Sequence, residues 1–258
     1  MADNSQPPVR NPSGNTTDQP FGPFADCGNG NPAFYHQFFD DFDESLGVAG
    51  LWVATGGGTA AHVAGDGGLA LLTTLAAASS AETLQLPAAS FVAASPQKMF
   101  FETRLQLGTL TTNSWAIGLL NQGATALAGI TDGIYFSKVA GTTTINLIVV
   151  KASVVSATIP VPVGAIGTYA AATNFDLAWY LDRHGDVRVY ANNQLIGWIP
   201  QSGTGSVSPP TAGLGPCARA TAPVLPTANL NVTISIANGT TAAATTMTVD
   251  LICVSKER

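Results

Sequence analysis

From residue 38 onward, hydrophobic and polar residues alternate with a period of two. In the segment 98–107, KMFFETRLQL, Thr103 and Leu105 fall on one side of the chain and Glu102 and Arg104 on the other. Successive side chains of a strand point to opposite faces, so this pattern predicts a half-buried β-strand.

Similar runs predict further strands along the rest of the chain. They cover residues 114–120, 133–137, 144–151, 154–159, 175–182, 187–191, 195–199, 230–237 and 247–254. Asn192-Asn193 and Asn238-Gly239 are turn signals between them, because asparagine and glycine tolerate positive φ angles. Only residues 75–83 have a helix-compatible composition, and they lack a sustained apolar stripe. The sequence therefore predicts an all-β jelly-roll sandwich of two antiparallel sheets.

Residues 1–33 differ from the rest of the chain. They hold six of the sixteen prolines and few apolar side chains before Phe21 and Phe24. A segment of this composition buries too little surface to offset its ordering entropy, so we expect an extended arm before a sandwich at 34–258. Two interpretations stay open: a frayed linker, or an arm that orders on a neighbouring subunit through Phe21, Phe24 and Phe34.

The chain is poor in charge. Apolar residues make up 46% and charged residues 10%, against about 25% charged in an ordinary domain. The surface must therefore expose uncharged residues or be buried against partners. The net charge is −6, and the ten Lys and Arg residues are scattered, so we expect no nucleic-acid partner.

Neither a membrane segment nor a secretion signal is expected. No apolar stretch reaches 18 residues, and the first 15 residues contain no apolar core of a signal peptide. Cys27, Cys217 and Cys253 are odd in number and widely spaced, which argues against a disulfide framework and a zinc site. We interpret Cys253 as a small core residue, and we expect no metal and no cofactor.

Residues 98–197 resemble the concanavalin A-like lectin/glucanase jelly-roll family, including its laminin-G-type members. The resemblance is carried by WAIGL at 115–119, DGIYF at 132–136, FDLAWY at 175–180, the polar turn at 182–186 and VRVY at 187–190. It covers about 100 of the 258 residues. It implies the jelly-roll fold, with a carbohydrate-binding module as one function.

The acidic, Ala/Thr/Gly-rich chain with its Pro/Asn arm also looks like virion proteins of tailed bacteriophages, above all capsid decoration or cement proteins. This resemblance implies a non-enzymatic subunit on the capsid surface, assembled in the host cytoplasm. Its partners would be the major capsid protein or other virion proteins and further copies of itself, with a trimer as one option. A lectin-like module of a phage tail or receptor-binding protein, with a glycan as ligand, is the alternative.

Candidate chemistry is sparse. A retaining glycosidase needs two carboxylates about 5 Å apart, and the glutamates at 44, 82, 102 and 257 are far apart in sequence. A glycoside hydrolase therefore remains a possible function only if distant strands bring another carboxylate close to Glu102. The acidic run 40–44 lacks the spacing of a calcium loop, so we interpret it as a strand end and turn.

The remaining candidates are also expected to be structural. Residues 182–186 read as a hairpin tip and the glycines at 56–58 as a turn. Three tryptophans, at 52, 115 and 179, are expected in the core. Trp198 is the tryptophan that we expect at the surface, where it would bind a partner.

Overall fold

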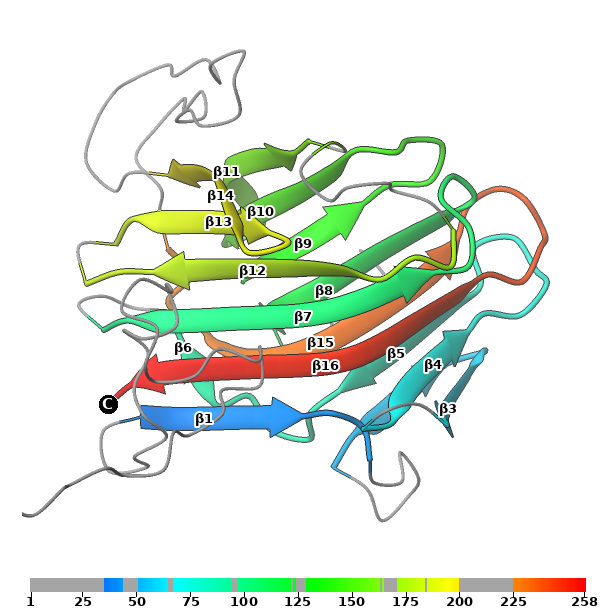
Figure 1. Ribbon diagram of the computed structural model, residues 1–258, viewed down its shortest axis with the longest axis horizontal. Coiled ribbons are helices and arrows are strands. Elements are labelled where there is room, and N and C mark those ends of the chain that lie inside the picture. The colour runs from blue at the N-terminus through cyan, green and yellow to red at the C-terminus, as the bar shows by residue number, and fades with distance from the viewer. Residues whose placement is uncertain are drawn as a thin grey trace, which may run out of the picture.

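The computed structural model describes residues 35–43, 51–64, 67–93, 97–121, 123, 129–162, 164, 171–183, 185–199 and 225–258. These residues form sixteen strands and no α-helix, so no described helix is long and apolar enough to cross a membrane. The strands make two antiparallel sheets that pack face to face, one in front of the other in Figure 1.

The front sheet has the strand order β14-β13-β12-β7-β16-β4-β3, and β1 pairs with the C-terminal half of β16 beside β4. Its strands are β1 (Tyr35–Asp40), β3 (Thr59–Val63), β4 (Leu69–Thr73), β7 (Met99–Leu107), β12 (Phe175–Leu181), β13 (Val187–Ala191), β14 (Gln194–Ile199) and β16 (Thr246–Glu257). The long strands β7 and β16 form its centre.

The rear sheet has the order β11-β10-β9-β8-β15-β5-β2, and β6 also pairs with β15. Its strands are β2 (Val53–Gly56), β5 (Ala81–Gln85), β6 (Phe91–Val92), β8 (Asn113–Asn121), β9 (Gly133–Lys138), β10 (Ile145–Lys151), β11 (Val154–Val161) and β15 (Asn229–Asn238). Strands β8 to β11 follow one another as hairpins in this sheet, and β12 to β14 do so in the front sheet, while other connections cross from sheet to sheet.

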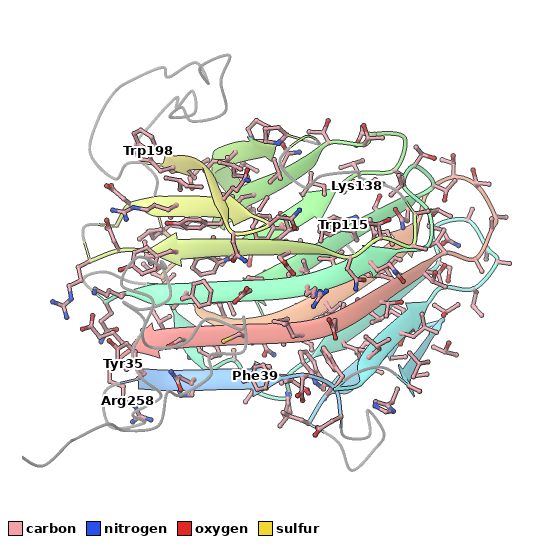
Figure 2. All side chains as sticks on the ribbon, viewed as in Figure 1. Tyr35, Phe39, Trp115, Lys138, Trp198 and Arg258 are labelled. Carbon is pink, nitrogen blue, oxygen red and sulfur yellow. The ribbon has the colours of Figure 1, made fainter. Side chains whose placement is uncertain are left out.

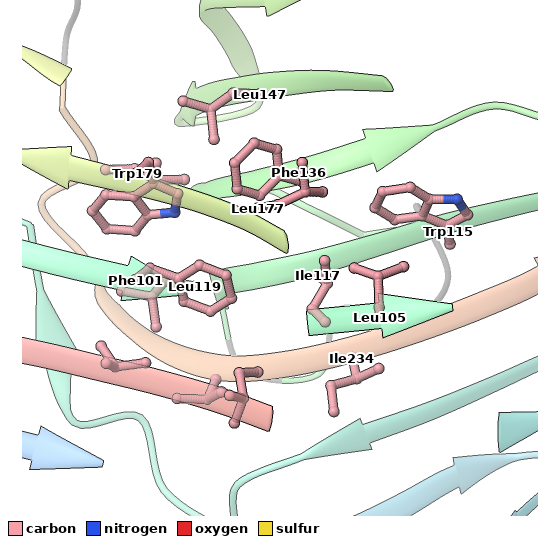
Figure 3. Close-up of a cluster of buried hydrophobic side chains, with 14 of the residues drawn as sticks. Phe101, Leu105, Trp115, Ile117, Leu119, Phe136, Leu147, Leu177, Trp179 and Ile234 are labelled. Carbon is pink, nitrogen blue, oxygen red and sulfur yellow. The ribbon is translucent and has the colours of Figure 1, made fainter. Parts of the chain in front are cut away.

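The core lies between the two sheets and is made by every second residue of their strands. Phe101 of β7 and Trp179 of β12 stack at 5.9 Å between ring centroids, and Phe136 and Ile117 face them from the rear sheet (Figure 3). Burial of each such side chain contributes about 1.5–3 kcal/mol. The alternating pattern places these apolar side chains between the sheets, and their burial holds the two sheets together.

The ten strands expected from alternation are confirmed, and β13 has the expected bounds. Residues 75–83 contain no helix: residues from Ala81 onward form β5, which pairs with both β2 and β15. Pairing with the two neighbouring strands determines the conformation of this segment, and its local composition does not.

The expected turns are confirmed where they are described. Asn192 and Asn193 have φ angles of 45° and 63° in the β13–β14 hairpin. The glycines at 56–58 turn the chain from β2 to β3. A Cβ at Gly58 would lie 2.2 Å from the backbone oxygen of Thr73, so this turn requires glycine.

Candidate functional site

The outer face of the front sheet carries most of the chemically distinctive side chains. Strand pairing aligns them in rows across the sheet. Phe100 lies between Ser255 and Tyr180, and Glu102 lies between Cys253 and Ala178. Because these residues alternate with core residues along the same strands, the pattern that builds the core also places them outside.

Aromatic and small apolar residues form a cluster on this face. Phe100, Ala178, Tyr180 and Tyr190 pack together there, with Leu195 and Cys253 at the margin. Phe100 and Tyr180 are each 3% exposed, so these rings do not offer open flat faces. The guanidinium carbon of Arg188 lies 5.9 Å from the centroid of the Tyr180 ring, at cation–π distance.

An ionic cluster adjoins the aromatic cluster. The Nε atom of Arg104 lies 3.7 Å from a carboxylate oxygen of Asp176 and 3.4 Å from one of Asp250. Asp250 falls at a register shift in the pairing of β16 with β7. Burial and the nearby Asp250 raise the pKa of Asp176, and Arg104 lowers it. The arrangement holds two carboxylates around one cation.

Glu102 is buried beside this cluster. Burial, and in second place the charge of Asp176, raise the pKa of Glu102 to about 8. The structure thus brings together two carboxyl groups that are 74 residues apart in the sequence. The sequence analysis had left open such a pairing between distant strands. Two neighbouring carboxyl groups with raised pKa values are a combination that acid–base catalysts use.

The other described glutamates are structural. Glu82 points into the sandwich beneath the 56–58 turn, where burial raises its pKa. Glu257 accepts hydrogen bonds from both Nε and an Nη of Arg183, which hold the pKa of Glu257 below its usual value. Glu82 belongs to the rear sheet, and Glu257 shares the outer face of the front sheet with Glu102 and Asp176 but lies at the far end of β16, where Arg183 pairs with it.

The prediction for Cys253 is wrong. Cys253 lies on the outer face opposite Glu102 and packs against the aromatic cluster, not between the sheets. The register shift near Asp250 moves the alternation of β16 by one residue, so counting from the start of the strand gives the wrong face. Burial and then the charge of Glu102 raise the pKa of its thiol to about 12.

The binding residues predicted from sequence are partly described. Phe21, Phe24 and Phe34 lie outside the described residues. Trp198 is half-buried and pairs with Arg188 across β13 and β14, near the edge of the front sheet opposite Phe39 (Figure 2). The other three tryptophans are buried in the core, as expected.

The acidic run at 40–44 has a structural role in its described part. The Asp40 carboxylate accepts a hydrogen bond of 2.7 Å from the amide of Phe42 and one of 2.5 Å from the indole of Trp52. Among the described residues, no group of three or more His, Cys, Asp or Glu side chains could hold a metal ion.

The polar turn at 182–186 is also structural. The backbone oxygen of Asp182 accepts a hydrogen bond from the amide of Gly185, and its Oδ1 accepts one from the amide of Asp186. These hydrogen bonds close the β12–β13 hairpin. His184 lies outside the described residues. The interpretation of this segment as a hairpin tip is confirmed for the residues around it.

The sheet edges are a feature that the sequence analysis missed. The strands that end the two sheet orders, β2, β3, β11 and β14, contain no Asp, Glu, Lys or Arg, whereas β1, which pairs only with β16 among the described strands, carries Asp40. At the start of β11, Val154 is 64% and Val155 is 56% exposed. Only the pairing order identifies these strands as edges, although the uncharged run VVSATIPV is visible in the sequence.

A buried lysine lies inside the sandwich at the end of β9. Lys138 is fully buried, lies opposite Trp115 of the neighbouring strand β8, and donates hydrogen bonds to the backbone oxygen and to Oδ1 of Asn113 at 2.5 and 3.1 Å (Figure 2). Burial lowers the pKa of Lys138 to about 8. Its amine bonds only uncharged oxygens among the described residues, so we assign Lys138 a structural role in the core.

Comparison with known proteins identifies the fold. No protein-family model and no curated protein matches the chain. An endo-1,3-beta-glucanase from Streptomyces sioyaensis superposes with a TM-score of 0.58 at 15% identity, over 89% of this chain and 99% of that chain. The carbohydrate recognition domain of Emp47p superposes with a TM-score of 0.54 at 10% identity, over 88% and 98% of the two chains.

A protein of unknown function, SO2946 from Shewanella oneidensis MR-1, superposes with a TM-score of 0.52 at 12% identity, over 87% of both chains. The chain therefore has the concanavalin A-like lectin/glucanase sandwich fold. At such identities the likeness concerns the fold, and function must be argued from the site.

Proposed function

We propose that this chain is a non-enzymatic structural protein of a bacteriophage virion, which decorates or cements the capsid. The observation that carries the proposal is the character of the sheet edges. The strands β2, β3, β11 and β14, which end the two sheet orders, contain no charged side chain, and β11 exposes Val154 and Val155. Such edges favour contact with another protein surface.

The physical reason is the exposed backbone of an edge strand. Monomeric proteins guard such edges with lysines, prolines, bulges or covering loops, since unpaired amides and carbonyls otherwise bind another strand. Pro160 guards the end of β11 and a register shift interrupts its pairing with β10 at Ser156, but residues 154–159 retain their amides. Copies of this chain and the major capsid protein are the partners that we propose for these edges.

The charge deficit of the whole chain supports the same proposal. Only 10% of the residues are charged, so electrostatic repulsion opposes close packing of this protein against its neighbours less than it does for an ordinary domain. The proposed location on the capsid rests in addition on the composition of the chain, which resembles that of decoration and cement proteins of tailed bacteriophages.

A hydrolase is disfavoured by the surroundings of Glu102. A general acid must come within hydrogen-bond distance of the glycosidic oxygen, but Glu102 is 5% exposed. Its neighbour Asp176 is held by Arg104. Hydrolysis of β-1,3-glucan by the full chain, abolished in Glu102→Gln and retained in Glu257→Gln, would contradict the non-enzymatic proposal.

The capsid proposal is tested on purified particles. Phage particles from a lysed source culture are banded on a density gradient, and peptides of this chain are quantified against those of the shell protein. We expect this chain in the particle band at a copy number of the same order as the shell protein. Its absence from the particles, with abundant free protein in the same lysate, would contradict the proposal.

The second candidate is a carbohydrate-binding module. It is favoured by the aromatic and carboxylate side chains that share the outer face of the front sheet, since sugars stack on aromatic rings and bind planar polar groups. Trp198 is the ring that we expect to stack. A glycan array, read with and without calcium, would support this candidate if a ligand bound the full chain and Trp198→Ala lost it. An array without any binder would remove it.

A further inference from the structure

Three side chains with N–H donors lie together inside the sandwich, at the end where β8 begins and β9 ends. They are Asn113 and Trp115 of β8 and Lys138 of β9, and all three are fully buried. Trp115 lies directly opposite Lys138 in the strand register, and Asn113 precedes Trp115 by two residues and so shares its face. In Figure 3 the indole nitrogen of Trp115 points away from the hydrophobic cluster, and Figure 2 shows Trp115 and Lys138 at the same end of the sandwich.

These donors outnumber the acceptors around them. Nδ2 of Asn113 and Nε1 of Trp115 are buried and have no hydrogen-bond partner in the part of the chain that the structure describes. The ammonium of Lys138 has three protons to donate, and its two hydrogen bonds both go to oxygens of Asn113. Buried polar groups are nearly always hydrogen-bonded, because an unpaired donor loses its water without compensation. The cluster therefore calls for an acceptor.

The neighbouring amide of Asn238 cannot be that acceptor. Asn238 of β15 lies opposite Asn113 in the register. Its Oδ1 already accepts hydrogen bonds from the hydroxyl groups of Thr74 and Thr245. An amide oxygen has two lone pairs, so these two bonds use its capacity. The polar network at this end of the sandwich is closed and leaves the donors of Asn113 and Trp115 outside it.

The charge of Lys138 is not balanced by the described strands around it. Strands β8 and β15 contain no charged side chain, β9 contains none besides Lys138, and β10 carries only Lys151 at the opposite end. The charged side chains in the middle of the front sheet lie on its outer face, namely Glu102, Arg104, Asp176 and Asp250. A buried ammonium without a counter-charge is unfavourable.

We propose that this cluster is a binding site for a small monovalent anion of the halide type, which accepts hydrogen bonds from Nζ of Lys138, Nε1 of Trp115 and Nδ2 of Asn113. An anion supplies both missing elements, an acceptor for several N–H groups and a negative charge beside the ammonium. Hydrogen bonds between charged partners are stronger than neutral ones, which favours an anion over a water molecule. Because all three side chains are fully buried, the ion must be small enough to fit among core side chains.

The ion links the stability of the fold to the anion in solution. A ligand that binds the folded state and not the unfolded chain stabilises the protein as its concentration rises. A bound anion also stabilises the ammonium form of Lys138. The gain in stability above pH 8 that follows from burial of this amine is therefore smaller in chloride than in gluconate, an anion too large for the site. The inference is independent of the capsid proposal, which is carried by the sheet edges.

Thermal unfolding of the full chain in chloride tests the inference. Chloride replaces gluconate at constant ionic strength and neutral pH. We expect the melting temperature of the wild type to rise by at least about 3 °C between about 10 and about 300 mM chloride. Lys138→Met should abolish this rise, and Trp115→Phe should reduce it. A wild type that does not respond, or a rise that Lys138→Met retains, would overturn the proposal.

Trp179→Phe is the matched control for Trp115→Phe. Nε1 of Trp179 is also buried and has no acceptor among the described residues, but Trp179 belongs to the front sheet and lies opposite Phe101. The control removes an indole of the same size from the core, so its melting temperature should fall while its response to chloride stays that of the wild type. Equal loss of the response in both tryptophan variants would count against the site.

Bromide in crystals of the wild-type full chain locates the ion without any variant. The crystals are grown in sodium bromide, and an anomalous difference map is calculated from data collected at the bromine absorption edge. We expect a peak within hydrogen-bond distance of Nζ of Lys138 and Nε1 of Trp115. Density for a water molecule at this place, or bromide peaks at other places only, would overturn the proposal.

Discussion

The amine of Lys138 lies 2.5 Å from the backbone oxygen of Asn113, inside the sandwich and without a carboxylate partner among the described residues. Burial lowers the pKa of Lys138 to about 8. The folded protein therefore binds this proton more weakly than the unfolded chain does. The charged form costs stability below pH 8, and stability is regained as the pH rises from about 8 toward 10.5.

We expect Lys138→Met to remove this pH dependence. The free energy of unfolding of the wild type should rise by up to about 3 kcal/mol between pH 8 and 10.5 relative to the variant. Urea titrations of both proteins across this range measure the difference, and the subtraction cancels other titrating groups. A constant difference between the two proteins would contradict a lowered pKa for Lys138.

Glu102 gives the opposite dependence. Its pKa is raised to about 8, so the folded protein binds this proton more tightly than the unfolded chain, and stability falls as the pH rises from about 4.5 to 8. We expect Glu102→Gln to be more stable than the wild type at pH 8, by about 1–3 kcal/mol, and to show a flatter pH profile.

Glu257→Gln is the matched control for Glu102→Gln. Arg183 lowers the pKa of Glu257, so this carboxylate contributes stability above its unfolded pKa, and that stability is lost on acidification. Glu257→Gln should therefore be less stable than the wild type at neutral pH. Equal signs for the two variants would contradict the environments assigned to these carboxyl groups.

Asp40 holds the start of the sandwich together. Its two oxygens accept the amide of Phe42 and the indole of Trp52, so Asp40→Asn would turn one acceptor into a donor that faces another donor. We expect a loss of about 1–3 kcal/mol, measured by urea unfolding. The exposed Asp43→Asn should change stability by less than about 0.5 kcal/mol. Stabilisation of the wild type by calcium would contradict the structural role of Asp40.

Alternation in the sequence predicted most of the fold. Phe101 and Leu105 were identifiable as one face of their strand because the polar residues Glu102 and Arg104 alternate with that face, and the structure places both in the core. Short strands such as β2 and β5 were not identifiable. Their conformation depends on pairing with β15 and with each other, and a local pattern of four or five residues does not encode that pairing.

The candidate site could be predicted only in part. Glu102 and Arg104 were expected outside, but their proximity to Asp176 and Asp250 depends on the pairing of three strands that are distant in sequence. Cys253 was assigned to the wrong face because a register shift cannot be read from alternation. The uncharged edges were likewise hidden until the strand order was known.

Light scattering of the full chain tests the central claim, assembly through uncharged edges, most directly. The wild type is compared with Val154→Lys/Val155→Lys on β11 and with Leu75→Lys/Val139→Lys, which replaces two exposed apolar residues outside the strands. We predict an oligomeric mass for the wild type and the control variant, and a lower mass for the β11 variant. A wild type that stays monomeric at every concentration, or a β11 variant that keeps the wild-type mass, would contradict the claim.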